Sequence, residues 1–386
     1  MKDNRRNFLK KGASVAAAVS IGGISASIAN PHIVKEKDGF GSGLSDMAKD
    51  AGMQASEAYF SGMNERKIAL LKQMNVFGAV AGINTKLAGM DDAKPYEEKS
   101  VKAVKDAWGK VGLNFNVVEG PPSLGEKTKL GLEGRDEEIE NFITFMKSMS
   151  KAEIDTICYN WMPVIGWYRT KNDRPGRGGA LVTAFDYEDI KNAPLTQYGV
   201  VTKDTLWKNL EYFLKAVIPE AEKVGMKLAM HPDDPQVDNI KGISRIMTSV
   251  DNFKRLINLY PSPSNGITMC QGNFSLMGAD IPETVKYFGK KKLIHFVHFR
   301  NVQDLSGKVP SQAFTETFHD EGQIDMYKAM QTYYDIGFRG PIRPDHVPTM
   351  AGDSNEFPGY STIGSLFAWG YIKGLMEAVS KGKNKA

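Results

Sequence analysis

Short apolar runs alternate with longer amphipathic segments along most of the chain, beginning after a Gly/Ser/Asp-rich stretch at about residues 35–55. In the longer segments apolar residues recur at helical spacing, as at Ile68, Leu71 and Met74, which is typical of helices that bury one face. The short runs are the candidate strands: residues 57–62, 76–82, 115–120, 155–161, 226–232, 266–272, 293–301 and 340–346. Strands that alternate with helices predict a parallel sheet, and the simplest such α/β fold is a (β/α)8 TIM barrel. A doubly wound open sheet is the alternative, although no G-x-G-x-x-G motif follows the first strand.

One connection is much longer than the others. Residues 162–200, rich in Gly, Pro and Arg, form an excursion after the fourth candidate strand. Segments of this length without regular structure are commonly functional loops or lids. We therefore expect this excursion to lie near a functional site.

The charge of the chain is concentrated at its beginning. The 386 residues contain 49 Lys and Arg against 45 Asp and Glu, a net charge of +4. Residues 1–30 alone account for this excess, because they carry Lys2, Arg5, Arg6, Lys10 and Lys11 against Asp3. The remainder is electrically balanced and lacks the clustered basic excess of a nucleic-acid-binding surface, so we expect no nucleic-acid partner.

The first 30 residues have the pattern of an export signal. Two arginines precede Phe-Leu-Lys in the stretch NRRNFLKKG, and a weakly apolar run, ASVAAAVSIGGISASIA, follows. This run is too short and too rich in Gly and Ser to span a bilayer, and small residues near Ala29 suit cleavage. The pattern predicts a twin-arginine signal peptide at residues 1–30 and a periplasmic location. A chance basic N-terminus ahead of a disordered tail is the alternative.

The mature chain is then expected to hold a linker at residues 31–56 and one catalytic barrel domain at residues 57–386. We expect no integral membrane segment in it, and the sequence leaves homo-oligomer formation open. Cys158 and Cys270 are too few for a disulfide framework, although in an exported protein a single cross-link remains an alternative.

Polar residues stand at the ends of the last four candidate strands. These residues are, in chain order, His231, Cys270, His298 and Asp345, and His346 comes directly after them. In a barrel the strand ends converge on one rim, where active sites are built. Two imidazoles, one thiolate and one carboxylate would make a site for a divalent metal such as Mn²⁺, Fe²⁺ or Zn²⁺. Taken singly, each has a plainer alternative role as a hydrogen-bonded His, an apolar Cys or a capping Asp.

Two histidines lie close together on the seventh candidate strand. His295 and His298 are three residues apart, so they face opposite sides of the strand. His298 is nearer the strand end and is the better candidate ligand. We expect His295 to serve in packing.

Longer motifs around these residues resemble the mannonate dehydratase family. They are CYNWMP, HPDDP, CQGNFSLMG, IHFVHFRNV, FTETFHDEGQIDMYKAM, PIRPDH, and PGY followed by YIKGLMEA, and the similarity extends from about residue 57 to residue 378. The resemblance implies a (β/α)8 barrel of the xylose-isomerase-like type and a divalent metal, Mn²⁺ or Fe²⁺. It also implies dehydration of D-mannonate to 2-keto-3-deoxy-D-gluconate in uronate catabolism. By motif, the metal ligands would be His231, Cys270, His298 and Asp345, and the acid/base pair would be His346 and Tyr360.

Two loops depart from the family pattern. After the second strand, GINTKLAGMDDAKPYE (residues 82–97) stands where the family usually has His-His-Ile-Pro. After the third, GPPSLGEKTKLG (residues 120–131) replaces a Pro-Val-His-Glu pattern, although Glu119 and Lys129 remain. The metal side of the rim is therefore retained while the opposite side is rebuilt, which affects the distal part of the substrate.

Four further residues are candidates for substrate binding. Arg300 and Arg343 can pair bidentately with a carboxylate, with a structural salt bridge as the alternative. His319, on a loop after the seventh strand, is expected to contact the substrate or to support the residues around it, with a solvated loop residue as the alternative. Trp161 either flanks the pocket or packs at the start of the excursion.

Together these residues favour a metal-dependent hydro-lyase that acts on a small sugar acid. The rebuilt loops keep open a metal-dependent sugar isomerase or epimerase on the same barrel. A non-catalytic sugar-acid binding protein on an enzyme scaffold is the third hypothesis.

Overall fold

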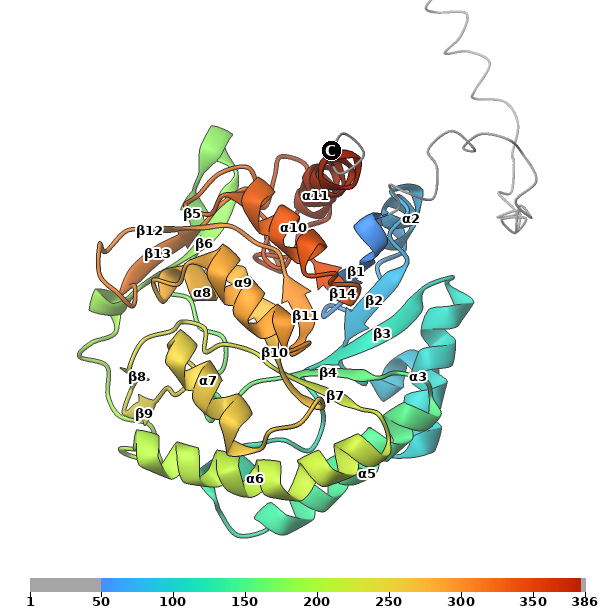
Figure 1. Cartoon of the computed structure of the whole chain (residues 1–386), viewed down its shortest axis with the longest axis vertical. Helices are drawn as coiled ribbons and strands as arrows, with labels where there is room; N and C mark the ends of the chain where they lie inside the picture. Colours follow the sequence, from blue (N-terminus) through green and yellow to red (C-terminus); the bar gives the residue numbers. More distant parts are fainter. Residues whose placement is uncertain (1–49, 383–386) are drawn as a thin grey trace, which may run out of the picture. The chain divides into compact units, whose positions relative to one another are not determined.

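The computed structural model describes residues 50–382. Its centre is a closed barrel of parallel strands in the order β1-β14-β11-β10-β7-β4-β3-β2, so each strand pairs with its neighbours in chain order (Figure 1). These strands are β1 (Gln54–Ala58), β2 (Gly78–Ala81), β3 (Asn114–Glu119), β4 (Thr156–Tyr159), β7 (Lys227–Met230), β10 (Asn265–Cys270), β11 (Ile294–His298) and β14 (Pro341–Arg343). Each overlaps one of the predicted runs, and the (β/α)8 barrel is confirmed.

Helices surround the barrel strands (Figure 1). They are α2 (Glu65–Gln73), α3 (Glu98–Lys110), α4 (Glu126–Leu130), α5 (Arg135–Lys151), α6 (Lys203–Lys223), α7 (Val250–Leu259), α8 (Gln271–Leu276), α9 (Ile281–Lys290), α10 (Met326–Asp335) and α11 (Thr362–Gly382). Capping side chains set several of their starts: Asn64 accepts from the Lys67 amide at 2.9 Å at the beginning of α2. Within residues 50–382, no helix combines the length and the apolar character needed to cross a membrane.

The segment predicted as an irregular excursion carries regular structure. Residues 162–200 contain β5 (Lys171–Pro175), β6 (Leu181–Asp186) and the short helices η3 (Arg177–Gly179) and η4 (Tyr187–Asp189). The two strands join β13 (Ala313–Glu316) and β12 (Val302–Asp304) in an antiparallel sheet of order β12-β13-β6-β5 (Figure 1). The expectation of a loop without structure was wrong, because the strands that pair with this segment belong to the insertion after β11, far along the chain.

The barrel begins earlier than expected. β1 starts at Gln54, and the short helix η1 (Asp50–Gly52) precedes it, so residues 50–56 belong to the barrel and not to the linker. An ion pair of 2.5 Å between Asp50 and Lys373 of α11 holds this start against the last helix. The predicted signal peptide and the rest of the linker lie outside the described residues.

Two smaller features complete the fold: η2 (Thr85–Ala88) and a ribbon of β8 (Asn239–Ile240) with β9 (Ile243–Ser244).

The two histidines of β11 lie toward opposite ends of the barrel. His295 lines a hollow at the amino end of the barrel. The other residues of this hollow include ones that precede or begin β7, β11 and β14. Its Nδ1 is 3.2 Å from the Leu228 carbonyl oxygen, and burial lowers the pKa of His295 to about 4. His298, the last residue of β11, lies at the opposite, carboxyl end.

Candidate active site

A cavity of about 290 Å³ opens at the carboxyl ends of the barrel strands. Most of its wall residues carry a charge or a hydrogen-bonding group, which suits a small polar ligand. Prominent among them are Phe60, Glu119, Asn160, Trp167, His231, Asp234, Arg343, Asp345, His346 and Tyr360.

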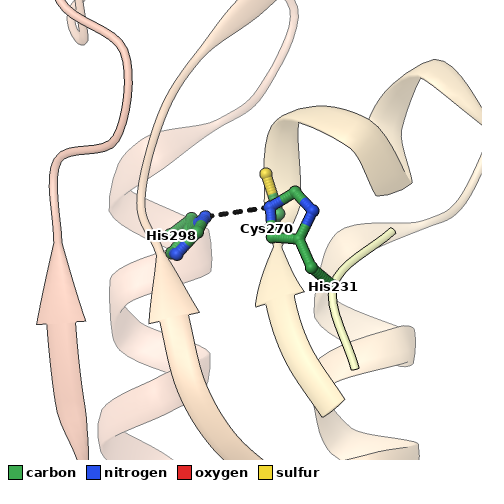
Figure 2. A group of neighbouring side chains, drawn as sticks. All are labelled: His231, Cys270 and His298. Carbon is green, nitrogen blue, oxygen red and sulfur yellow. Dashed lines mark hydrogen bonds between the residues drawn. The ribbon is translucent and has the colours of Figure 1, made fainter. Parts of the chain in front are cut away.

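Three of the predicted metal ligands meet at this end of the barrel. His231 follows β7, and Cys270 and His298 are paired at the ends of the adjacent strands β10 and β11. Their ligand atoms all lie within 4.8 Å of one another, and Figure 2 shows the two rings and the thiol gathered at the strand ends. One sulfur and two imidazole nitrogens are a donor set that suits a divalent transition metal, so this group can hold one.

A chain of hydrogen bonds orients the two imidazoles. Arg343 Nε donates to His298 Nε2 at 3.0 Å, and an arginine side chain can only donate. Arg343 Nη2 also lies 3.4 Å from His298 Nδ1, which in turn is 3.1 Å from His231 Nε2. His231 in turn donates from Nδ1 to the Pro232 carbonyl oxygen at 2.7 Å. Its Nε2 thus keeps a lone pair directed toward His298, as a metal ligand requires.

A second group of ligand atoms also lies within 4.8 Å, formed by Glu119, Cys158 and His298. It is a poor cation site, because Arg343 donates to both Glu119 oxygens at 3.1 and 2.9 Å as well as to His298. Burial, with the nearby Glu119 charge, raises the pKa of Cys158 well above its usual value, so this thiol stays protonated. Of the two cysteines, only Cys270 therefore lies in a group suited to a metal.

Asp345 adjoins the first group from the segment after β14. Its oxygens lie 3.5 Å from Cys270 Sγ and 3.6 Å from His298 Nδ1. The residue has a φ of 71°, a backbone conformation that is costly outside glycine and recurs at functional sites. Burial alone would raise the pKa of Asp345, but interactions with His346, Arg343, His298 and Arg300 hold it well below its usual range. The carboxylate is therefore ionised, as a ligand must be.

A buried cluster of ion pairs supports Asp345 from behind. Arg300 pairs with Asp345 and Asp234, each at 3.0 Å, and with Glu316. Arg169 pairs with Asp234 and, at 2.6 Å, with Glu316. Burial alone would raise the pKa of Glu316, but Arg300 and His346 lower it to about 2. Because Glu316 lies on β13 and Arg169 precedes β5, the antiparallel sheet supplies part of this support.

The two arginines predicted to bind substrate differ in their surroundings. Arg300 is fully buried in the ion-pair cluster and is not among the residues that line the cavity. Arg343 lines the cavity and is held by Glu119 and Asp345. For Arg300, the structure favours the salt-bridge alternative.

The predicted acid/base residues face each other across the cavity wall. The rings of His346 and Tyr360 are 5.4 Å apart in an edge-on arrangement. His346 Nδ1 lies 2.7 Å from Arg300 Nη1 and 3.1 Å from Glu316 Oε1. One of these partners donates and the other accepts, so both neutral tautomers of the ring can be stabilised. Burial raises the pKa of Tyr360 in spite of Arg343, so the phenol keeps its proton at neutral pH.

Comparison with known proteins identifies the family. The model of the D-mannonate dehydratase (UxuA) family matches residues 53–196 and 191–386. The chain belongs to the D-mannonate dehydratase family. It is 33% identical over 355 residues to mannonate dehydratase 2 of Halalkalibacterium halodurans, covering 85% of this chain and 100% of the relative. It is also 33% identical over 352 residues to mannonate dehydratase of Thermotoga neapolitana, covering 82% and 95%.

Solved structures agree with this membership. The mannonate dehydratase of Streptococcus suis serotype 2 superposes with a TM-score of 0.76 at 30% identity, covering 86% of this chain and 95% of that one. A xylose isomerase domain protein of Planctomyces limnophilus superposes with a TM-score of 0.53 at 11% identity, covering 85% and 98%. This second likeness shows the fold alone: the xylose-isomerase-like barrel of the prediction.

Two predicted substrate contacts of this mannonate dehydratase family member lie away from the cavity. Trp161 has no exposed surface, donates from Nε1 to the Leu206 carbonyl oxygen at 3.2 Å and packs on Phe213. His319 is also fully buried, with Nε2 3.0 Å from the Pro344 carbonyl oxygen. Neither residue is a substrate contact: Trp161 takes the packing alternative, and His319 supports the segment that precedes Asp345.

Sequence reasoning missed other members of the site. Trp167, not Trp161, is the tryptophan of the cavity wall, with its ring 5.3 Å from that of His346. Asp234 could have been found from its position after β7 in the HPDDP motif. Glu316 had no such signal, because it lies on a strand outside the barrel.

Proposed function

We propose that this protein is a metal-dependent hydro-lyase that converts D-mannonate to 2-keto-3-deoxy-D-gluconate and water. The observation that carries the proposal is the convergence of His231, Cys270 and His298 beside Asp345 in a family member whose cavity also holds His346 and Tyr360. Loss of water requires breaking the C2–H bond and the C3–O bond, with C2=C3 formed between them. The resulting enol then becomes the 2-keto acid.

The residues His231, Cys270, His298 and Asp345 would hold the divalent metal, with Mn²⁺ or Fe²⁺ as our expectation. When bound, such an ion offsets the negative charge that develops on the substrate carboxylate as C2 loses its proton. Metal loading requires a deprotonated Cys270 and a lone pair on His298 Nδ1.

We assign the proton acceptor for C2 to His346 and the proton donor for the leaving hydroxyl to Tyr360. Burial keeps Tyr360 protonated, so it suits the donor role. His346 can take a proton on Nε2 while Nδ1 donates to Glu316, 3.1 Å away. Arg343 lines the same cavity and is our candidate partner for the carboxylate of the substrate.

The decisive experiment is to incubate the Mn²⁺- or Fe²⁺-loaded protein with D-mannonate and to measure the 2-keto-3-deoxy product. Turnover that disappears in Tyr360→Phe and His346→Gln, with metal content retained, supports the assignment. Exchange of the C2 proton with solvent without loss of water would instead indicate an epimerase. Tight binding with no reaction would indicate a binding protein.

We further propose that the protein is exported by the twin-arginine route to the periplasm. The support is the Arg5-Arg6 pair followed by the weakly apolar run in residues 1–30. Replacing both arginines by lysine is expected to leave the full-length protein in the cytoplasm, as measured by cell fractionation. Unchanged export of this variant would contradict the proposal.

A further inference from the structure

A second cavity lies beside the first at the barrel mouth. It measures about 390 Å³ and is built on the carboxyl ends of β1, β2 and β3. Phe60, Glu119 and Gly120 belong to the walls of both cavities, so the two adjoin. A ligand can therefore extend from the first cavity into the second past these residues.

The two cavities face different ends of the substrate, if the proposed function holds. The candidate metal ligands follow β7, β10, β11 and β14, so the carboxylate and the reacting carbons belong on that side. The second cavity lies on the opposite side of the barrel mouth, over β1, β2 and β3. It is therefore placed for the distal end of the same molecule.

The first cavity is large enough for a single small acid. Small-molecule sites commonly measure about 300–1,000 Å³, and the first cavity, at about 290 Å³, stands at the lower end of this range. The second cavity adds a volume of at least the same size. A six-carbon acid bound at the metal side leaves this added space unused.

The chemistry of the second cavity favours a neutral sugar ring. None of the residues that line it is Lys or Arg, so it offers no basic side chain to bind a phosphate or a second carboxylate. Phe60, 37% exposed, presents an aromatic face, and Ile83, Leu87 and Pro122 add apolar walls. Aromatic rings of this kind pack against the apolar face of a sugar.

One side chain offers a directed donor to such a ring. Asn84 Oδ1 accepts from the Lys86 amide at 3.2 Å, which fixes the orientation of the side-chain amide. Its Nδ2 has no hydrogen-bond partner among residues 50–382, and Asn84, an exposed residue, is among those that line the second cavity. A sugar hydroxyl can accept from this nitrogen.

From these observations we infer that the substrate is a sugar acid whose distal hydroxyl carries a second, neutral sugar, and that this sugar occupies the second cavity. The inference rests on the proposed dehydration at the first cavity. The reaction itself is unchanged: C2–H and C3–O break, water leaves, and the glycosidic bond stays intact. The product is the 2-keto-3-deoxy acid that still carries its sugar.

The test compares D-mannonate with D-mannonate that carries a glucosyl group on its C6 hydroxyl. We expect the metal-loaded full chain to convert the extended acid with a kcat/KM about tenfold higher, because the added ring gains contacts in an otherwise empty cavity. Leu87→Trp, which fills the second cavity only, should reduce kcat/KM for the extended acid about tenfold or more. The same variant should leave kcat/KM for D-mannonate within about twofold.

Two further variants control for nonspecific effects. Asn84→Asp keeps the Oδ1 that caps the Lys86 amide but removes the donor, and should reduce kcat/KM for the extended acid alone. Val200→Trp introduces the same side chain at an exposed position outside both cavities and should leave kcat/KM unchanged for both substrates. Unchanged D-mannonate turnover in each variant also reports that the protein has folded.

The outcomes separate this inference from the proposed function. Turnover of D-mannonate without turnover of the extended acid would overturn the inference and leave the proposed function standing. Equal losses for both acids in Leu87→Trp would overturn it as well. If the metal-loaded protein converts neither acid, the proposed function fails and the inference fails with it.

Discussion

The two sides of the barrel mouth differ in burial and in charge. The side formed after β7, β10, β11 and β14 is buried and charged, and its ionisable groups are held in ion pairs. The side formed after β1, β2 and β3 is more open and carries no basic side chain, with Tyr59, Asn84 and Glu119 as its polar side chains. Chemistry on charged intermediates needs fixed charges in a water-poor site, whereas recognition of a distal group needs shape and exposed surface. The difference suggests that reaction and substrate choice are separated across the mouth.

The largest expected effect comes from removing the sulfur ligand on the charged side. Cys270→Ser should lose its bound metal and lower turnover by more than about 100-fold, because even outer contacts of a metal cost up to about that much. Cys158→Ser is the matched control, since Arg343 occupies the group to which Cys158 belongs. Metal analysis and turnover should be measured on both variants. If Cys270→Ser keeps its metal and its activity, Cys270 is a core packing residue and not a metal ligand.

The second prediction concerns the ion-pair cluster. Glu316→Gln removes the buried carboxylate that pairs with both Arg169 and Arg300, and the loss of one partner of a buried ion pair should lower the free energy of unfolding by about 3–5 kcal/mol. Asp320→Asn is the control, because its pair with Arg177 is solvent-exposed and should contribute less than about 1 kcal/mol. Denaturant titration of the metal-free proteins measures both. Equal losses of unfolding free energy in the two variants would show that burial does not increase the contribution of these ion pairs to stability.

The third prediction concerns pH. Burial lowers the pKa of His319 to about 4 in the folded protein. As pH falls, His319 therefore becomes protonated in the unfolded chain at a higher pH than in the folded protein. The contribution to stability is therefore complete above about pH 6.5 and is lost between about pH 6.5 and 4, amounting to about 3 kcal/mol. His319→Gln should flatten the pH dependence of the unfolding free energy in this window.

His295 provides the comparison for that experiment. Its pKa is also lowered to about 4 by burial, but it lies at the amino end of the barrel. His295→Gln should flatten the same pH window and leave turnover unchanged, whereas His319→Gln should also reduce turnover through the segment before Asp345. Equal turnover in the two variants would contradict a supporting role for His319.

The smallest expected effect lies at the boundary between the two sides. The Phe60 ring packs edge-on against Tyr360 at 5.3 Å and lies 5.6 Å from the Arg343 guanidinium. Phe60→Leu removes these contacts and should lower kcat for D-mannonate by about three- to tenfold, corresponding to about 1 kcal/mol for such an aromatic pair. Metal content should stay at the wild-type level. A change in metal content would show that the two sides are not separate.

Much of the charged side could be predicted from the sequence. His231, Cys270, His298 and Asp345 each follow or end a strand with a clear apolar pattern, and strand order in a barrel brings such ends together. Contacts made by Arg300 could not be predicted in this way. Arg300 pairs with Asp234 and Glu316 and does not line the cavity. This arrangement depends on a sheet whose strands come from two separate insertions.

The sequence by itself determined the barrel, the chain order of the candidate ligands and the family, because these follow from local periodicity and from motifs that are continuous along the chain. Only the tertiary structure decided which tryptophan lines the cavity, which arginine remains at the surface of the cavity, and why Cys158 lies in a group unsuited to a metal. The physical reason is that each of these depends on charges and side chains brought from distant segments. Cys158 lies within β4 in a group whose Glu119 is paired with Arg343, whereas Cys270 ends β10 in a group that adjoins Asp345.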